Sequence, residues 1–299
     1  MNIFVDSPVS DDARRMELFR GAVFVHSPVP SALKLCALAK ELIEEAFQPH
    51  DPLKIHHYIT AERCAEILGV LKPKFIHHPE SKVCIQGILS ELGCDPGQTY
   101  FDVPRMRTGF PGDYLKFGIA YAFHPHRDTW YSAPYCQINW WMPIFDLSSE
   151  NCMAIHPQYF DRSIKNNSRD YNYQKWNLES RQNAAQHVKA DTRVQPRPEE
   201  PVELHPQLRL VCKVGSLFQF SAACLHSTVP NTTDVVRYSI DFRTVHFADA
   251  LNRLGAPNVD SQCTGTTMGD YLRGTDLSNL PPQLISMYDG GTKVMSASA

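Results

Sequence analysis

The sequence predicts a mainly β protein, a jelly roll with flanking helices and a helical N-terminal third. Two observations support this fold class. Between residues 98 and 248, segments rich in β-branched and aromatic residues alternate with turn residues, without helical periods between them. Residues 1–97 instead carry apolar residues at helical spacing. We therefore expect a single domain over 1–299, with a helical part (1–97), a jelly-roll core (98–248) and a C-terminal extension (249–299).

Three helices are expected in the first third. The first covers 31–47, with Ser31 as its cap after a proline, and the second follows Thr60 as its cap. The third covers about 80–92 and ends at Gly93.

The core segments read as strands that are interrupted once. The expected strands lie within 99–103, 114–123, 135–144, 208–220 and 235–247. A polar stretch, about 156–206, separates the third from the fourth. Structureless segments of this length are uncommon unless they serve a site, so this insertion is either a surface insertion or a lid.

Composition narrows the class of protein. The 299 residues are 43% hydrophobic and 20% charged, which is ordinary for a globular protein. The net charge of −3 gives no electrostatic reason to expect nucleic acid or a membrane as partner. No stretch approaches the roughly 18 apolar residues of a membrane span, and the first residues lack the apolar segment of a secretory signal, so we expect a cytoplasmic protein. The nine cysteines include no C-x-x-C pair, which argues against a zinc ribbon, an iron–sulfur signature or a disulfide framework.

The stretch 123–131, FHPHRDTWY, carries the strongest chemical signal. His124, His126 and Asp128 alternate, so an extended backbone would point all three the same way. His226 offers a further imidazole. Two histidines and one carboxylate on one side of a metal leave three positions open, as in the facial triad of non-heme Fe(II) oxygenases. His126, Asp128 and His226 are therefore the candidate metal ligands.

Two expected strands place polar groups on one face of the core. Gln137 and Asn139 share a face with Trp141, and such groups need partners from a ligand or from a buried network. Arg237, eleven residues after His226, shares its parity with Ser239, Asp241 and Arg243. A buried guanidinium needs an anion, which an organic acid on the metal or Asp241 could supply.

This order of residues resembles the Fe(II)/2-oxoglutarate-dependent dioxygenases over about 100–245. H-x-D is followed after 98 positions by a histidine and then by Arg-x-Ser, and the eleven-residue step resembles the phytanoyl-CoA dioxygenase-like branch. The resemblance implies a double-stranded β-helix, Fe(II) as the metal, and 2-oxoglutarate as cosubstrate with its distal carboxylate on Arg237 and Ser239. We place Gln137 and Asn139 beside them as further cosubstrate-binding candidates.

The resemblance also implies oxidation of a substrate C–H bond by dioxygen, with release of succinate and CO2. Related halogenases replace the carboxylate ligand with a small residue, so Asp128 points to hydroxylation or another oxidative outcome. Trp130, Tyr131 and Trp141 are the expected substrate walls. We expect a small polar metabolite or natural-product intermediate, because the sequence shows no obvious basic cradle for the phosphates of an acyl-CoA.

Several alternatives stay open at this level. Lys116 and Arg243 could replace Arg237 as the anion anchor, and His124 could be a packing residue or a support for the ligands. A metallo-hydrolase could use the H-x-H-x-D stretch, although Thr129 stands where a second metal would need a histidine. A jelly-roll binding protein without catalysis is the third possibility.

Overall fold

Two β-sheets form the centre of the computed structural model, which describes residues 1–120, 124–179, 187–188, 193 and 195–290. Within these residues the larger sheet has the strand order β1-β2-β8-β5-β10-β3-β11, with β4 also paired to β10. The smaller sheet has the order β7-β6-β9. All pairs are antiparallel except β1 with β2. The strands are β1 (Ile3–Val5), β2 (Val23–His26), β3 (Thr99–Phe101), β4 (Arg105–Gly109), β5 (Ile138–Pro143), β6 (Met153–Ile155), β7 (Leu208–Arg209), β8 (Leu217–Ser221), β9 (His226–Thr228), β10 (Arg237–His246) and β11 (Leu272–Arg273).

This sheet-rich arrangement is consistent with the predicted jelly-roll-like fold. The two sheets meet where His126 forms an isolated backbone bridge with His226 at the start of β9. The first 97 residues contain four helices, but they also contribute β1 and β2 to the larger sheet, which the sequence analysis did not predict.

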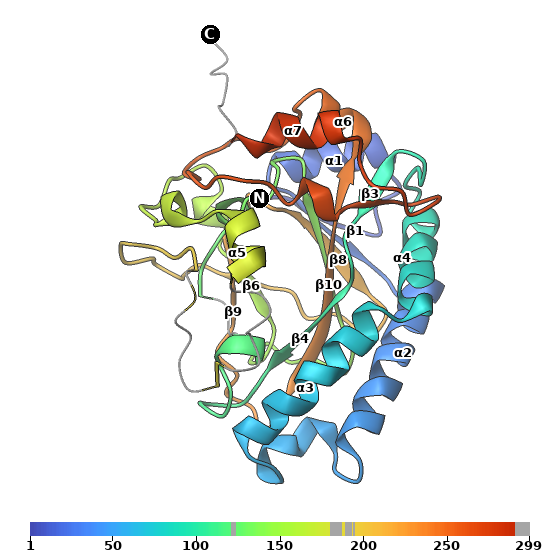
Figure 1. Ribbon diagram of the computed structural model, residues 1–299, viewed down its shortest axis with the longest axis vertical. Coiled ribbons are helices and arrows are strands. Elements are labelled where there is room, and N and C mark those ends of the chain that lie inside the picture. The colour runs from blue at the N-terminus through green and yellow to red at the C-terminus, as the bar shows by residue number, and fades with distance from the viewer. Residues whose placement is uncertain (121–123, 180–186, 189–192, 194, 291–299) are drawn as a thin grey trace.

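The helices surround the larger sheet (Figure 1). Helices α2, α3 and α4 lie together along one flank, α1, α6 and α7 gather at one end, and α5 lies on the side of the smaller sheet. The helices are α1 (Asp11–Phe19), α2 (Pro30–Phe47), α3 (Ala61–Ile76), α4 (Pro79–Glu91), α5 (Tyr173–Glu179), α6 (Phe247–Leu251) and α7 (Pro282–Asp289).

The helix boundaries follow local rules. The Thr60 side chain accepts a hydrogen bond from the Arg63 N–H and caps α3 as predicted. Helix α2 begins one residue earlier than expected, because Pro30 occupies its first turn and Val29 is the cap residue. Ser31 is therefore not the cap, and its hydroxyl donates to Glu91 instead.

Strand β10 is the central element for the site. It pairs with β5 along one edge and with β4 and β3 along the other. Paired residues of antiparallel strands lie side by side on one face. Ser239 therefore lies beside Arg107, Asp241 beside Trp141, and Arg243 beside Asn139.

The predicted strand over 114–123 is wrong for its described residues, 114–120. Gly118 adopts a left-handed conformation, with φ of +60°, and residues Gly118–Ala120 form a 3-10 turn, η2. Residues 121–123 lie outside the described residues. The alternation argument that put Lys116 on an inner face fails with the strand, since Lys116 pairs with Asp113 and its side chain is 44% exposed.

Two other predictions concern the cysteines and the membrane. None of the nine cysteines forms a disulfide, and seven are buried, as expected for small apolar side chains. Among the helices of the described residues, none is long and apolar enough to cross a membrane.

Candidate metal centre

The structure brings His126, Asp128 and His226 together at the junction of the two sheets. The backbone N–H of His126 donates to the carbonyl of His226 at 3.0 Å, and the reverse bond measures 2.9 Å. The N–H of Asp128 donates to the carbonyl of Ala222 at 3.0 Å. These backbone bonds fix two segments that lie a hundred residues apart, so that one ligand atom from each of the three side chains falls within 4.8 Å of the others.

Both imidazoles are oriented by backbone carbonyls. The Nδ1–H of His126 donates to the carbonyl of His124 at 2.8 Å, and that of His226 donates to the carbonyl of Cys224 at 3.0 Å. Each Nε2 then faces Oδ1 of Asp128, at 3.6 Å from His126 and 3.8 Å from His226. A carbonyl on Nδ1 fixes the tautomer in which Nε2 carries the lone pair that can bind a metal, which is the usual support of a histidine ligand.

The electrostatics keep His226 and Asp128 in their metal-binding forms. Burial, with a contribution from His126, lowers the pKa of His226 to about 3, so its imidazole is neutral. Burial alone would raise the pKa of Asp128, but His126, Arg243 and His226 outweigh it and hold that pKa below its ordinary value. Neutral imidazole and ionised carboxylate are the forms that bind a metal.

Gln137 orients the carboxylate ligand. Its Nε2 donates to Oδ2 of Asp128 at 3.1 Å and to Oδ1 of Asn139 at 2.8 Å, and its Oε1 accepts from the hydroxyl of Tyr271 at 2.6 Å. The polar groups predicted on the strand over 135–144 therefore find protein partners. Gln137 supports Asp128, and both Gln137 and Asn139 line the cavity described below.

Two residues of the FHPHRDTWY stretch are not part of the candidate ligand cluster. The Nε2 of His124 hydrogen-bonds the carbonyl of Pro196 at 2.8 Å, its ring meets the His126 ring edge-on with the centroids 6.2 Å apart, and its backbone carbonyl accepts from Nδ1 of His126. Trp130 is fully buried and donates its indole N–H to Asp260 at 2.7 Å. It packs in a separate apolar cluster with Tyr159 and does not line the cavity, so we do not retain it as a substrate wall.

Strand β10 contributes a second feature of the site, the buried residues Arg237 and Ser239 on one of its faces. Arg237 is 6% exposed and Ser239 is fully buried, yet Nε of Arg237 and Oγ of Ser239 have no hydrogen-bond partner among the described residues. Gly109 leaves room for the guanidinium, because a Cβ at this position would lie 3.2 Å from that Nε. Burial lowers the pKa of Arg237 to about 10. Buried donors without partners beside an arginine are what an anionic ligand would satisfy.

The two competing anchors are already paired. Lys116 pairs with Asp113 near the surface. Arg243 lies 3.2 Å from Asp102, 3.3 Å from Asp241 and 3.6 Å from Oδ2 of Asp128. Arg243 therefore compensates carboxylates, including the candidate metal ligand, and Arg237 remains the better candidate for an incoming anion.

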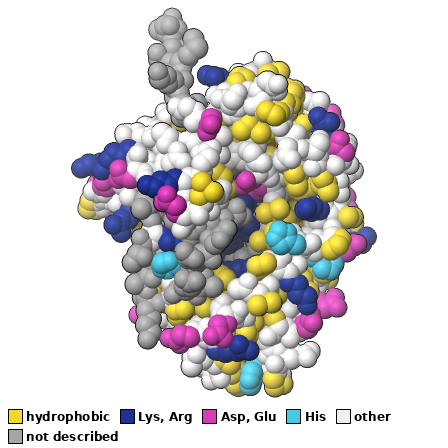
Figure 2. All heavy atoms as spheres, in the orientation of Figure 1, with side chains coloured by type: hydrophobic (Ala, Val, Ile, Leu, Met, Phe, Trp, Pro, Cys, Tyr) yellow, Lys and Arg dark blue, Asp and Glu magenta, His cyan; other side chains and the backbone are white. Residues whose placement is uncertain are grey.

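The candidate metal ligands and Arg237 line one cavity of about 530 Å³. Figure 2 shows lysine or arginine side chains in a hollow near the middle of one face. Tyr131 and Trp141 are in the cavity wall, and the guanidinium of Arg237 lies 6.0 Å from the Trp141 ring centroid. Tyr171, Tyr173 and Trp176 of the insertion also line the cavity, as expected if this segment covers a site.

Four basic residues of the wall were not predicted from the sequence. Arg105 and Arg107 alternate along β4, Lys72 enters from α3, and Arg193 comes from the insertion. The alternation in RMRTG, just before a proline-glycine turn, was a usable signal of a strand with a basic face. Nothing in the sequence around Lys72 distinguishes it from a surface lysine.

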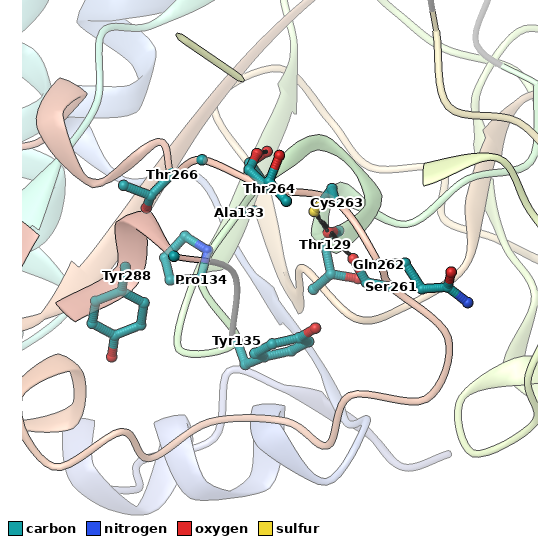
Figure 3. Close-up of a pocket in the computed structure, with 13 residues that line it drawn as sticks. Thr129, Ala133, Pro134, Tyr135, Ser261, Gln262, Cys263, Thr264, Thr266 and Tyr288 are labelled. Carbon is teal, nitrogen blue, oxygen red and sulfur yellow. Dashed lines mark hydrogen bonds between the residues drawn. The ribbon is translucent and has the colours of Figure 1, made fainter. Parts of the chain in front are cut away.

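A smaller cavity of about 200 Å³ is lined by Thr129, the residue after Asp128, and by residues of the segment 261–266 (Figure 3). Ser261 donates to the carbonyl of Thr129 at 2.6 Å, and the thiol of Cys263 donates to the same carbonyl at 3.1 Å. These bonds fix the 3-10 turn Asp128–Tyr131, η3. The segment around 261–263 therefore helps to hold Asp128 in place.

Comparison with known proteins gives fold-level likenesses only. No protein-family model matches the chain, and no curated protein matches it. Among solved structures, EvdO2 from Micromonospora carbonacea var. aurantiaca is 13% identical over 82% of this chain and 94% of its own, with a TM-score of 0.46, and it has also been solved complexed with 2-oxoglutarate. The epimerase SnoN, in complex with Fe3+, alpha ketoglutarate and nogalamycin RO, is 13% identical over 79% of this chain and 85% of its own, with a TM-score of 0.40.

The carbocyclase SnoK from nogalamycin biosynthesis, described as non-heme and alpha ketoglutarate dependent, is 14% identical over 84% of this chain and 94% of its own, with a TM-score of 0.39. These identities and TM-scores are too low to transfer an activity. The functional proposal therefore rests on the residues of this chain.

Proposed function

We propose that this chain is a non-heme Fe(II)/2-oxoglutarate-dependent oxygenase that oxidises, most simply by hydroxylation, a C–H bond of a small polar metabolite. The observation that carries the proposal is the buried triad of His126, Asp128 and His226 in one cavity with Arg237. Nε of Arg237 and Oγ of Ser239, two residues further along β10, are buried without a hydrogen-bond partner among the described residues. The first set suits a metal with open positions, and the second suits the distal carboxylate of a dicarboxylic acid.

The residues divide the work in this proposal. Bound Fe(II) would supply the activation of dioxygen, coupled to conversion of 2-oxoglutarate to succinate and CO2. His126, Asp128 and His226 hold the metal, and Gln137 orients the carboxylate. Arg237 aligns the cosubstrate by binding its far end.

The walls of the cavity serve the substrate. Tyr131 and Trp141 bound the space beside the ligands, and α5 adds aromatic residues from the insertion, residues 156–206. Such walls position the substrate C–H bond and exclude water from the reacting centre. The insertion is proposed as the lid. The step of eleven residues between His226 and Arg237 leads us to propose the phytanoyl-CoA dioxygenase-like branch and its double-stranded β-helix.

The alternatives are less well supported by the geometry. A metallo-hydrolase of the H-x-H-x-D type would use both histidines of that stretch, whereas the Nε2 of His124 is bound to a backbone carbonyl. A binding protein without catalysis would not require two imidazoles oriented toward one carboxylate in a cavity. Metal content together with 2-oxoglutarate turnover separates the three functions.

The first experiment removes each metal ligand. His126→Ala, Asp128→Ala and His226→Ala should each strongly reduce Fe(II) stoichiometry and succinate formation, because three protein ligands leave little redundancy. His124→Ala is the matched control and should keep its iron, since the Nε2 of this residue is bound to the Pro196 carbonyl and its side chain is not one of the three clustered donors. If His126→Ala keeps iron while His124→Ala loses it, the ligand assignment is wrong.

The second experiment addresses the cosubstrate. Arg237→Met should raise the 2-oxoglutarate dissociation constant about thirtyfold or more, because losing a buried charged partner costs on the order of 2–5 kcal/mol. Arg237→Lys keeps the charge but not the planar fork, so its loss should be smaller. Anaerobic titration of each Fe(II) form measures this, with Arg243→Met and Lys116→Met beside it. Normal affinity in Arg237→Met, with lost affinity in either comparison variant, would move the anchor.

A further inference from the structure

The cavity that holds the candidate metal centre carries an excess of positive charge. Among its described lining residues, six are basic: Lys72, Arg105, Arg107, Arg193, Arg237 and Arg243. Four are acidic: Asp102, Asp128, Asp241 and Asp270. The excess of two positive charges persists after loading, because a divalent metal and the two carboxylates of 2-oxoglutarate cancel each other.

Most of the arginines are neutralised by protein carboxylates. Asp102 pairs with both Arg105 and Arg243, and Asp241 pairs with Arg107 at 2.6 Å and with Arg243 at 3.3 Å. These cations hold the wall together and offer little to a further anion. Under the proposed function, Arg237 is taken by the cosubstrate.

Lys72 is different from these arginines. Its ammonium group donates to the backbone carbonyl of Ile119 in η2, and no carboxylate of a described residue lies within 4.0 Å of it. An ammonium has three donors, so further donors remain available on the cavity side. Burial, reinforced by the charge of Arg107, lowers the pKa of Lys72 to about 7. A partly buried cation without an anion is unfavourable and is stabilised by a ligand that supplies one.

A second cation converges on the same short turn. Arg193, from the insertion, donates from Nη2 to the carbonyl of Gly118 at 3.3 Å, one residue before the carbonyl that Lys72 contacts. Helix α3 and the insertion thus each bring a positive side chain to η2, at the cavity wall. Two positive groups at adjacent carbonyls are chemically suited to contact an anionic group.

We propose that the substrate carries an anionic group, a carboxylate or a phosphate, and that Lys72 binds it beside η2, with Arg193 as the second cation. This inference rests on the proposed function, because it takes Arg237 to be occupied by 2-oxoglutarate. The inference narrows the proposed substrate class from polar metabolites to acidic metabolites. It also gives the insertion a direct part in recognition, since Arg193 belongs to it.

The test measures anion binding without turnover. The full-length protein is loaded anaerobically with Fe(II) and saturating 2-oxoglutarate and titrated calorimetrically with inorganic phosphate and, separately, with acetate. At least one probe should bind the wild-type protein, and whichever binds identifies the anion class. Lys72→Met and Lys72→Gln should each weaken that binding about tenfold or more, because a charge-assisted hydrogen bond is lost.

The matched control is Lys74→Met. Lys74 lies on the same helix, but it is 48% exposed and pairs with Glu45 on the outer surface, so its loss should leave probe binding unchanged. The Lys72 variants should also keep the wild-type affinity for 2-oxoglutarate. The inference is overturned if neither probe binds the wild-type protein, if the Lys72 variants bind the probes as well as wild type does, or if they lose 2-oxoglutarate affinity instead.

A screen for succinate formation gives an independent readout. Compounds that are turned over should carry a carboxylate or phosphate, and their neutral esters or amides should be poor substrates. Equal turnover of the neutral forms would overturn the inference while leaving the oxygenase assignment in place. Failure of the proposed function is recognised separately, as a wild-type protein that binds neither Fe(II) nor 2-oxoglutarate.

Discussion

Gly109→Ala is the most specific perturbation of the proposed cosubstrate anchor. Gly109 pairs with Arg237 across β4 and β10. A Cβ at this position would lie 3.2 Å from Nε and 3.3 Å from both Cζ and Nη2 of Arg237. Ordinary contacts between non-bonded heavy atoms are about 3.5–4.0 Å. The guanidinium must therefore move by a few tenths of an ångström, although no charge is removed.

The expected effect lies between no change and complete loss of the anchor. A displaced guanidinium keeps its attraction for the cosubstrate but loses part of its directed hydrogen bonding, which is worth about 1–2 kcal/mol. That raises the 2-oxoglutarate dissociation constant about five- to thirtyfold. Fe(II) affinity should be unchanged, because the metal ligands lie on other elements of the structure.

Anaerobic titration of 2-oxoglutarate into the Fe(II) form measures the effect. Gly269→Ala is the matched control, because a Cβ there would meet no atom within 4 Å. Unfolding midpoints of both variants show whether the fold is intact. Wild-type cosubstrate affinity in Gly109→Ala would show that the cosubstrate carboxylate does not bind where this guanidinium lies, and an equal loss of iron would show that the effect is not local.

Three further outcomes are expected. Gln137→Leu should weaken metal binding about ten- to a hundredfold in a direct titration, because Asp128 loses its orienting donor. Tyr271→Phe, which removes the partner of Gln137, should weaken metal binding less. Equal effects of the two variants would contradict the role of Gln137. Burial lowers the pKa of His26, so the folded state resists protonation of this imidazole, and folding stability is lost as the pH falls below about 6.5. His26→Gln should reduce that loss by up to about 1.4 kcal/mol per pH unit, measured by denaturant unfolding at pH 7.5 and 5.5. An unchanged loss of stability would contradict this role of His26. Amide hydrogens of the described parts of 156–206 should exchange more slowly once a substrate is bound, and unchanged exchange would favour the surface-insertion interpretation.

The alternation of strand β10 was predictable from local periodicity, and the candidate metal triad from the types and order of its residues. Period-two alternation placed Arg237 and Ser239 on one face, and the register with β5 and β4 agrees with it. The triad was predictable because H-x-D followed by a distant histidine is a recognisable donor set, although its convergence depends on backbone bonds between His126 and His226 that no local pattern shows.

The substrate wall was less predictable because the sequence does not reveal the 3-10 turn at Asp128. In a 3-10 helix, residues three apart lie on the same side. Asp128 and Tyr131 therefore both reach the cavity, whereas Trp130 is directed into a separate apolar cluster. Adjacency to the ligand pair suggested a common role for both aromatic residues, and only the turn geometry separates them.

The failed strand over 114–123 has a consequence for charge. An extended chain there would have put Lys116 in the cavity, whereas the turn at Gly118 leaves Lys116 outside and presents the carbonyl of Ile119 to Lys72. The basic wall is thus made by a helix lysine that the sequence does not distinguish from its neighbours. Tertiary placement, and not local pattern, decides which lysine serves the site.

The distribution of charge along the cavity points to the ligands more directly than any single motif does. In a buried ion pair, each charge is already compensated by its partner. A buried cation without such a partner has an unfavourable desolvation free energy, which a bound anion can offset. Arg243 and Arg107 both pair with Asp241, so these two cations stabilise the cavity wall and are not expected to bind a ligand. Arg237 and Lys72 have no such match within 4.0 Å among the described residues. If each of these two cations binds one anion, the cavity must receive two separate acidic groups, one from a cosubstrate with a free carboxylate and one from the substrate. The Arg237 variants test the binding of the first anion, and the Lys72 variants test the binding of the second.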